Sequence, residues 1–364
     1  MTGNIGREGT GINPMRGQNN IQGAGDSGAI PATYPGFHPV VDPEHQAKLK
    51  TLSGREVPTE VGITKVTALD RSGEQIRAMI INGENTVVSD PDRNHCEHAL
   101  KSLDHLVVID LFLTETGELA DVVFPAAGFG EADGTCANTE RRVQRLRAAV
   151  TPHGQAKPDW WIVSQIARRL GIEGFEYESA RDVFNELCGL SPIYAGLDWD
   201  RVENGEFQWP VPEKDHPGTP ILHEGEFENG RGIFTVLNYR DPAETIDDEY
   251  PVWLTTGRRL ASYHTRTQSG RAHGIDYLLS EETLEVHPDD LSAWGLEDGS
   301  LCEMASRRGA VQVKVEATSR SPRGTVFCSF SFNDVPVNIL TGSGYDPVTQ
   351  TAELKGCPVR ISKA

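Results

Sequence analysis

The pattern of apolar and polar residues changes along the chain. Three short apolar runs, Ile76–Ile81, Leu106–Leu113 and Ala120–Phe124, accompany a helical pattern over residues 94–103. Continuous apolar runs that alternate with helices are typical of a parallel sheet buried on both faces. The pattern therefore predicts an α/β region, in which ligands bind beyond the carboxyl ends of the strands. The loops that we expect to carry functional residues are residues 82–89, 110–116 and 125–131.

Two further helices are predicted downstream. Residues 159–170 place an apolar stripe on one helical face, with Asp159 as a candidate N-cap and Gly171 as the end. A second helix is predicted over residues 179–187, where a serine is followed three residues later by an aspartate. Residues 1–40 are rich in Gly, Asn and Pro, which predicts an extended, loop-dominated segment.

The pattern becomes mostly β after Pro251. In the run 310–315, three valines at 311, 313 and 315 alternate with Gln312 and Lys314, so one face of this strand is expected to be buried. Further strands are predicted at residues 252–256, 301–306 and 325–332, with a short helix at residues 288–293. A closed β domain fits this pattern best. Residues 191–250, which are rich in Pro, Gly and acidic residues, are predicted to be a long connection with short strands.

Charge and hydropathy exclude several classes of protein. The 364 residues carry 34 Lys and Arg against 53 Asp and Glu, a formal net charge of −19. Nonspecific nucleic-acid binding and docking on anionic membranes both need a basic face. No run approaches the ~18 apolar residues of a membrane-spanning helix, and no signal peptide is recognisable. We expect a cytoplasmic protein with no nucleic-acid partner and no membrane insertion.

The cysteines do not form a motif. Six cysteines are widely spread without a C-x-x-C pair, which predicts reduced, mostly buried thiols and no iron–sulfur or zinc site within this chain. His95, Cys96 and His98 are close in sequence, but the start of a helix explains them better than a metal site. Residues 23–28 satisfy G-x-G-x-x-G, yet no apolar strand precedes them, so a classical NAD site is rejected.

Motifs in order along the whole chain resemble one family. The motifs lie in residues 1–30, which contain Arg-Gly-Gln-Asn-Asn, and in residues 82–85, 120–125, 138–144, 157–160, 208–210, 215–220, 254–258, 263–265, 346–347 and 353–355. Together they are similar to the catalytic (alpha) subunit of molybdenum or tungsten formate dehydrogenases, which are molybdopterin-guanine-dinucleotide oxidoreductases. Members are about twice as long, so the resemblance is to the C-terminal half of such a subunit.

The resemblance implies a fold and a set of cofactors. Residues 1–245 would be a partial α/β region of the family's dinucleotide-binding domains, and residues 246–364 a double-psi β-barrel-like domain that binds the molybdopterin dinucleotide. The expected cofactor is bis-molybdopterin guanine dinucleotide with Mo or W. A [4Fe-4S] cluster and the metal-binding residue are expected only in an N-terminal part that this chain lacks, so activity is not expected without it.

The resemblance also implies site residues. Arg16, with Gln18 beside it, would face the metal and the substrate, and a guanidinium can hold the carboxylate of formate by two hydrogen bonds. The cofactor-binding residues would be Gly83, Glu84, Asn85, Ser89, Asp110, Asp159, Arg258, Tyr263, His264, Asn338 and Lys355. Alternatives stay open for three of them: a turn residue for Asp110, a helix N-cap for Asp159 and a satisfied core or surface histidine for His264.

The expected function is the oxidation of formate to CO₂. The expected partners are formate and an N-terminal-half chain or other formate dehydrogenase subunits. Two alternatives remain: an assimilatory nitrate reductase-like chain and a non-catalytic cofactor-binding fragment. The arginine in Arg16–Asn20 favours formate, because nitrate reductases of this group have a small polar residue at that position.

Overall fold

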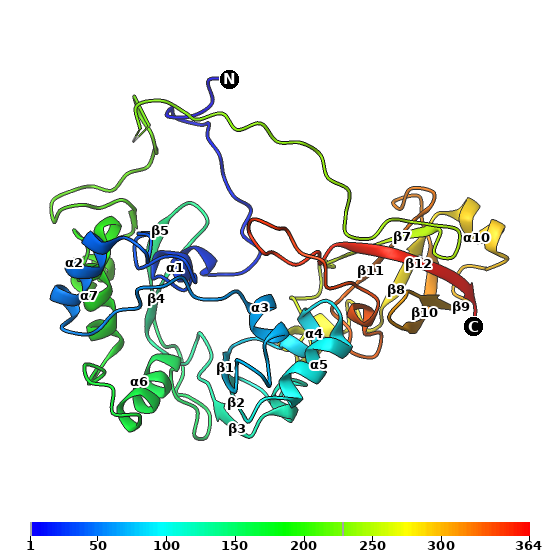
Figure 1. Cartoon of the computed structure of the whole chain (residues 1–364), viewed down its shortest axis with the longest axis horizontal. Helices are drawn as coiled ribbons and strands as arrows, with labels where there is room; N and C mark the ends of the chain where they lie inside the picture. The colour runs from blue at the N-terminus through cyan, green and yellow to red at the C-terminus, as the bar shows by residue number, and fades with distance from the viewer. Residues whose placement is uncertain (1, 228) are drawn as a thin grey trace. The chain divides into compact units, whose positions relative to one another are not determined.

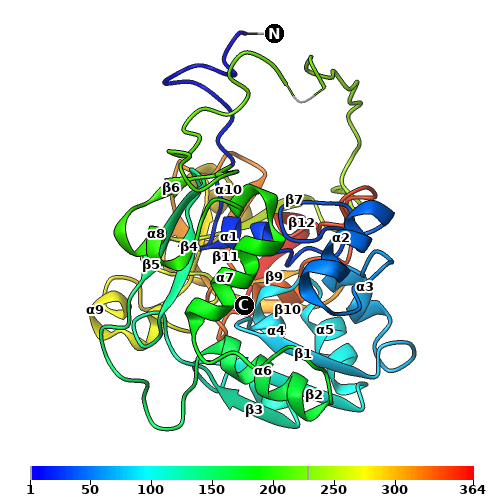
Figure 2. The same cartoon turned by 90° about the vertical axis from the view of Figure 1, so that its left-hand side faces the viewer.

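The chain folds into two compact units. The computed structural model describes residues 2–227 and 229–364. The first unit combines Met1–Ile63 with Pro125–Leu237, and the second combines Thr64–Phe124 with Asn238–Ala364 (Figures 1 and 2). Each unit is therefore built from two stretches that are far apart in the sequence. The domain boundary at residues 245/246 stays a prediction.

The predicted parallel sheet lies in the second unit. Strand β1 (Ala78–Asn82) pairs in parallel with β2 (His105–Asp110), and the sheet has the order β1-β2-β3, where β3 is Val122–Pro125. All residues of β2 after His105 are buried, as its continuous apolar run predicts. Helix α5 (Arg93–Lys101) connects β1 to β2 and contributes Leu100 to their core. The three strands and the helix predicted here are confirmed.

Helix α5 begins earlier than the sequence indicates. Asp92 is the N-cap, and its carboxylate accepts a hydrogen bond from the backbone N–H of His95 at 3.3 Å. Cys96 is fully buried and His95 lies 3.1 Å from Asp70. These residues belong to an ordinary helix, as expected.

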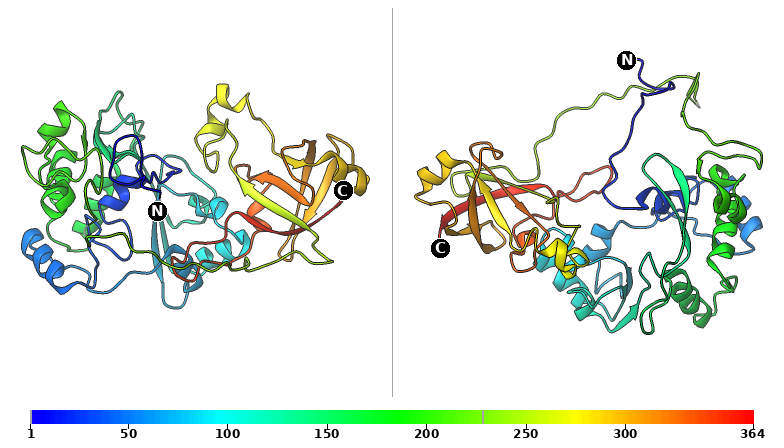
Figure 3. Two further views of the ribbon diagram at one scale, coloured as in Figure 1. Left: turned by 90° about the horizontal axis from the view of Figure 1, so that it is seen from above. Right: turned by 180° about the vertical axis from the view of Figure 1, so that it is seen from behind.

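The predicted closed β domain is a barrel of six strands in the second unit (Figures 1 and 3). The strands are β7 (Val252–Gly257), β8 (Thr283–Val286), β9 (Leu301–Ala305), β10 (Ala310–Ala317), β11 (Thr325–Ser329) and β12 (Gly356–Lys363). They close in the order β10-β8-β11-β7-β12-β9. The pairs β10/β8 and β11/β7 are parallel, whereas β9 and β10 form the predicted antiparallel hairpin.

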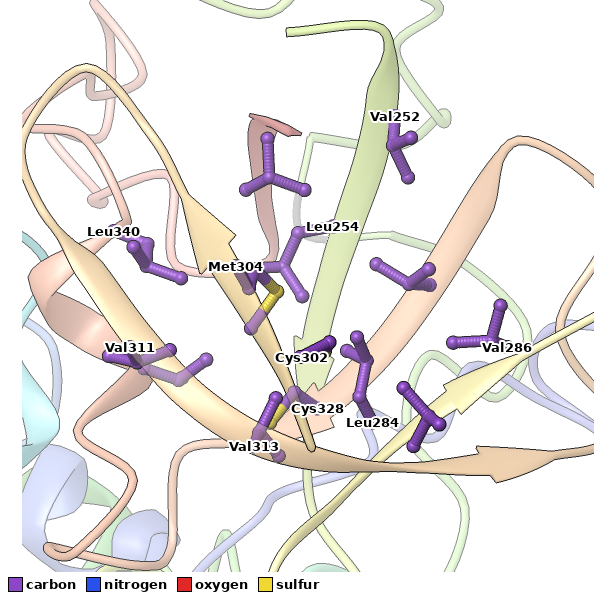
Figure 4. Close-up of a cluster of buried hydrophobic side chains, with 14 of the residues drawn as sticks. Val252, Leu254, Leu284, Val286, Cys302, Met304, Val311, Val313, Cys328 and Leu340 are labelled. Carbon is purple, nitrogen blue, oxygen red and sulfur yellow. The ribbon is translucent and has the colours of Figure 1, made fainter. Parts of the chain in front are cut away.

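One apolar core fills the barrel (Figure 4). Leu254, Leu284, Met304 and Val326 come from four different strands and have no exposed surface. The pleat explains this arrangement, because alternate residues of each strand point inward, as the valines of β10 do. The predicted short helix is α10 (Pro288–Trp294), which starts with proline and ends at Gly295.

The remaining elements of the second unit are short. They are α3 (Lys65–Asp70), α4 (Thr86–Ser89), α9 (His273–Asp276) and the 3₁₀ turns η1 (Gly117–Leu119), η3 (Ser269–Arg271) and η4 (Val337–Ile339). Turn η4 contacts both α5 and β10, and two hydrogen bonds join these parts of the unit. The side-chain amide of Asn338 donates to the carbonyl of Val88 at 2.8 Å, and the N–H of Asp92 donates to the carbonyl of Thr341.

The first unit is helical with a small sheet. Its helices are α1 (Ile21–Asp26), α2 (Pro43–Ser53), α6 (Asp159–Arg169), α7 (Ala180–Leu190) and α8 (Trp199–Asn204), with the 3₁₀ turn η2 (Pro192–Tyr194). Its sheet has the order β4-β5-β6, formed by Gly134–Ala137, Arg142–Leu146 and Phe207–Gln208. Its core includes Val143, Phe184 and Tyr194.

Of three expectations for the first unit, the structure confirms one and corrects two. Ser179 and Asp182 form a reciprocal capping box at the start of α7, as predicted. Pro158, and not Asp159, occupies the N-cap of α6, so the N-cap alternative for Asp159 is wrong and the aspartate lies in the first helical turn. Helix α1 forms inside the predicted loop over residues 1–40. Its Asp26 accepts a hydrogen bond from Tyr194, which is distant in sequence.

Two further predictions, on membrane-spanning helices and on the cysteines, can be compared with the described residues. None of the helices in residues 2–227 and 229–364 combines the length and apolar character needed to cross a membrane. All six cysteines are free thiols, and only Cys136 is partly exposed, which confirms the expectation of mostly buried, reduced cysteines.

Candidate functional site

The loop after β1 reaches the carboxyl end of the sheet, where ligands were expected. Gly83 adopts φ +67°, and a Cβ there would meet no atom within 4 Å, so the backbone conformation favours glycine and crowding does not. The N–H of Gly83 donates to the carbonyl of Ile109 at 2.8 Å. The exposed backbone of this glycine leaves room for a ligand to approach closely.

Asn85 holds this loop against the loop after β2. Its amide nitrogen donates to Glu115 at 2.7 Å, and its oxygen accepts hydrogen bonds from the N–H and the hydroxyl of Thr116. The side chain is buried. These contacts give Asn85 a positioning role, and its predicted contact with a cofactor stays a prediction.

Lys65 closes the loop after β1 into a ring of polar contacts. Its ammonium forms ion pairs with Glu84 and with the buried carboxylate of Asp90, each at 2.5 Å. The hydroxyl of Ser89 donates to the same two carboxylates. Burial lowers the pKa of Lys65, but the charges of Asp90 and Glu84 outweigh this effect, and the pKa is raised. Lys65 was not predicted, since no motif surrounds it and its partners lie 19 and 25 residues away.

Two predicted cofactor-binding residues that follow β7 lie around the ring of Phe330, the residue after β11. The guanidinium of Arg258 lies 5.7 Å from the ring centre of Phe330, and the imidazole of His264 meets the same ring edge-on at 5.3 Å. Tyr263 precedes His264 and is 45% exposed. Lys355 is close to this strand, because its carbonyl accepts hydrogen bonds from Thr255 and Thr256.

Arg258 and Lys355 are cations without a counter-charge. Neither residue forms an ion pair with any acidic side chain in the part of the chain that the structure describes. Most other arginines of the barrel are paired, for example Arg259 with Glu282 and Glu285. In a chain of net charge −19, two unpaired cations at one strand end indicate a site for an anion.

Charges from both the sheet loop and the barrel act on His264 within the second unit. Burial lowers the pKa of His264, and the charges of Arg258, Lys65 and Lys355 lower it further, while Glu84 acts in the opposite direction. A hydrogen-bonded path agrees with this proximity. The hydroxyls of Thr64 and Thr67 donate to Gln350 at 3.1 and 3.2 Å, in the segment that leads to Lys355.

Two other predicted residues are buried within the same unit. Asp110 ends β2 and accepts a hydrogen bond from the N–H of Leu111 at 2.7 Å. Burial raises the pKa of Asp110. Asn338, besides its bond to Val88, accepts a hydrogen bond from the hydroxyl of Thr341. Their contacts are turn and packing contacts, so a cofactor contact remains a prediction for both.

Arg16, Gln18 and Asp159 belong to the first unit. The Arg16 loop is anchored by Asn20, whose side-chain oxygen accepts a hydrogen bond from the N–H of Ala137 at 3.0 Å. Gly23 permits this approach, since a Cβ there would lie 3.2 Å from the same nitrogen. Arg16 is exposed, and among the described residues it forms no ion pair. The buried side-chain oxygen of Gln18 also has no hydrogen-bond partner among those residues, which leaves it available to a ligand.

Asp26 is a buried carboxyl beneath the Arg16 loop. It has no exposed surface, and its oxygens accept hydrogen bonds from Gln22 at 2.8 Å and from the hydroxyl of Tyr194 at 2.7 Å. Burial raises the pKa of Asp26, although these hydrogen bonds and the charge of Arg16 oppose the effect. The sequence analysis missed this residue, because its partner Tyr194 is distant in sequence.

Asp26 predicts a pH dependence of stability. A carboxyl with a raised pKa binds more protons in the folded than in the unfolded state, so its contribution to stability falls as the pH rises from about 3.8 through the folded pKa. We expect Asp26→Asn to flatten this decline in the free energy of unfolding. Denaturant titrations at pH 4 to 7 on both proteins would measure it. An equally steep decline in the variant would contradict the prediction.

Comparison with known proteins defines the class. Residues 1–169 match the molybdopterin oxidoreductase family, and residues 252–358 match the molydopterin dinucleotide binding domain. The chain belongs to the molybdopterin oxidoreductases. Among relatives, it is 45% identical over 367 residues to the F420-dependent formate dehydrogenase 2 subunit alpha of Methanococcus maripaludis, covering 100% of this chain and 54% of the relative. It is 44% identical to the corresponding subunit of Methanocaldococcus jannaschii, with the same coverage.

Other relatives extend the comparison. The assimilatory nitrate reductase catalytic subunit of Bacillus subtilis is 33% identical, covering 99% of this chain and 53% of the relative. The chain therefore spans about half the length of these curated relatives. The structure of acetylene hydratase from Pelobacter acetylenicus resembles the fold with a TM-score of 0.65 at 18% identity, covering 88% of this chain and 50% of that chain.

Proposed function

We propose that this chain forms the cofactor-binding and substrate-facing part of a formate dehydrogenase catalytic subunit. The observation that carries the proposal is the group of cations around His264, in which Arg258 and Lys355 have no acidic partner among the described residues. The names of the relatives at 44–45% identity support formate, and the nitrate reductase relative is less similar. The proposal includes formate and an N-terminal-half chain or other formate dehydrogenase subunits as partners. It also includes a cytoplasmic location.

The residues fit a molybdopterin guanine dinucleotide. Its pyrophosphates are anions that Arg258, Lys355 and His264 can bind, and the open backbone of Gly83 allows phosphate to approach. The buried oxygen of Gln18 offers an acceptor to an N–H of a bound group. We further infer that the barrel, with its two parallel strand pairs, is of the double-psi type.

The protein residues would bind and orient formate. When bound, the cofactor supplies the molybdenum or tungsten centre that takes up two electrons as formate becomes CO₂ and a proton. Arg16 would hold the formate carboxylate by paired hydrogen bonds and offset its negative charge while the C–H bond breaks. Asn20 and α1 would keep the Arg16 loop in place, since Asn20 is bonded to β4.

Co-expression tests the proposal. The chain is produced together with a polypeptide that supplies the remaining length of the family, and bound metal, pterin and formate-dependent dye reduction are measured. We expect molybdenum or tungsten, pterin and activity in the pair. Pterin without activity would favour the non-catalytic alternative, and nitrate reduction would favour the other one. Absence of pterin from the pair would overturn the proposal.

Arg16 separates catalysis from cofactor binding. Arg16→Ala is expected to lower kcat/KM for formate about a hundredfold, as for the loss of one donor to a developing charge, while pterin content is unchanged. Arg16→Lys keeps the charge but not the paired hydrogen bonds, so it should recover only part of the activity. Unchanged activity in Arg16→Ala would contradict the assignment.

A further inference from the structure

Lys65 has one hydrogen-bond donor more than the described residues use. An ammonium group carries three N–H donors. One is directed to Glu84 and one to Asp90, and the side chain remains 42% exposed. One N–H of Lys65 therefore has no acceptor among the residues that the structure describes.

The surroundings of this N–H are those of the anion site. Lys65 acts electrostatically on His264 together with Arg258 and Lys355. Thr64, the residue before Lys65, is bonded to Gln350 in the segment that carries Lys355. Lys65 also pairs with Glu84, one residue after the exposed backbone of Gly83. The spare donor thus belongs to the same part of the second unit as the unpaired cations.

The contacts of Lys65 include one carboxylate more than a single ion pair requires. Asp90 is buried and needs one counter-charge, which Lys65 supplies. Glu84 is only half-buried and could be solvated without Lys65. Two carboxylates at different positions of the loop form ion pairs with this one flexible lysine. The ammonium is therefore held in place instead of moving freely in solvent.

We propose that Lys65 is a phosphate-binding residue of this site, with Glu84 and Asp90 as the groups that position it. Its third N–H donates to a phosphate oxygen of a guanosine diphosphate group, the chemical class of the dinucleotide arm. This inference rests on the proposed function and adds a residue from outside the motifs that suggested it. It also assigns Glu84 the role of positioning Lys65, in addition to any contact of Glu84 with the ligand itself.

GDP and guanosine are the probes that test the proposal. Binding of each to the full chain is measured by calorimetry. Lys65→Met is expected to weaken GDP binding about tenfold, since the lost hydrogen bond is charge-assisted, and to leave guanosine binding unchanged. Lys65→Arg, which keeps a cation, should retain most of the affinity for GDP. Lys101→Met is the matched control, because Lys101 is an exposed, ion-paired lysine of the same unit and should leave both affinities unchanged.

Each remaining outcome has a defined meaning. Equal losses for GDP and guanosine would show a merely structural role and overturn the proposal, and so would an unchanged affinity for GDP. If Lys65→Met leaves Asp90 unpaired and the chain misfolds, Lys65→Met with Asp90→Asn is compared with Asp90→Asn alone. Arg258→Ala and Lys355→Ala test the proposed function separately. Weaker GDP binding in these two but not in Lys65→Met overturns only the inference, whereas no GDP binding by the unaltered chain overturns both.

Discussion

Replacing Leu254 by alanine is expected to lower the free energy of unfolding of the barrel by about 2–5 kcal/mol, the range for removing a buried leucine side chain from a core. Leu254 lies in the middle of β7, paired with Val326 of β11 and Cys357 of β12, and has no exposed surface. Figure 4 shows its side chain in the core beside that of Met304. The closed barrel has no free edge through which the strands could collapse into the cavity, so the loss should be in the upper part of this range.

Hydrogen exchange measures this loss where it occurs. Backbone amides of β7 and β11 exchange through opening of the barrel, so their protection reports its local free energy. Leu260→Ala is the matched control, because Leu260 is fully exposed in the same unit and its truncation should change stability by less than about 0.5 kcal/mol. Equal protection in the two variants would contradict the assignment of Leu254 to a tightly packed core.

Glu282→Gln is expected to destabilise the barrel by about 3 kcal/mol, the lower end of the range for breaking a buried ion pair. The side chain of Glu282 has no exposed surface, and it pairs with Arg259 at 2.9 Å and accepts a hydrogen bond from Ser329. Glutamine keeps the shape but removes the charge. Arg259 retains Glu285, which limits the loss.

The adjacent residue provides the control. Glu281 forms an ion pair with Lys314, but both side chains are more than half exposed. Glu281→Gln should therefore change stability by at most about 1 kcal/mol. Denaturant titration followed by the fluorescence of Trp253 and Trp294, two tryptophans of the second unit, would distinguish the two variants. A loss in Glu281→Gln as large as that in Glu282→Gln would refute the argument from burial.

The elements that could be predicted are those whose buried residues form a recognisable local pattern in the sequence. The continuous apolar run of β2 and the alternating valines of β10 identify both strands directly. Strand β8 has only four residues after two glutamates, and β12 contains Pro358, so neither has such a pattern. These two strands form because their neighbours in the barrel offer backbone partners. That information lies elsewhere in the chain.

The positions of the candidate site residues were predictable only in part, and their roles stay predictions. The motifs singled out Arg258 and His264, which lie around the ring of Phe330, and Lys355, whose carbonyl is bonded to β7. Lys65 and Asp26 were not predicted from the sequence. Each has partners that are distant in the sequence and become neighbours only in the folded chain. A charge-complementary pair of residues far apart in sequence is too common in any chain to predict a contact without the structure.

The division of each unit into two distant stretches has a consequence for synthesis. The carbonyl of Val88 accepts a hydrogen bond from Asn338, and Thr64 donates one to Gln350, so both bonds form only after the second stretch has been made. At about 5–20 residues per second, the ribosome needs on the order of ten seconds to make the stretch between the two parts of the second unit. During this interval the apolar strands β1 and β2 are present without the barrel. Exposed apolar strands favour aggregation, so slow synthesis should lower the yield of this chain more than that of a unit made from one continuous stretch.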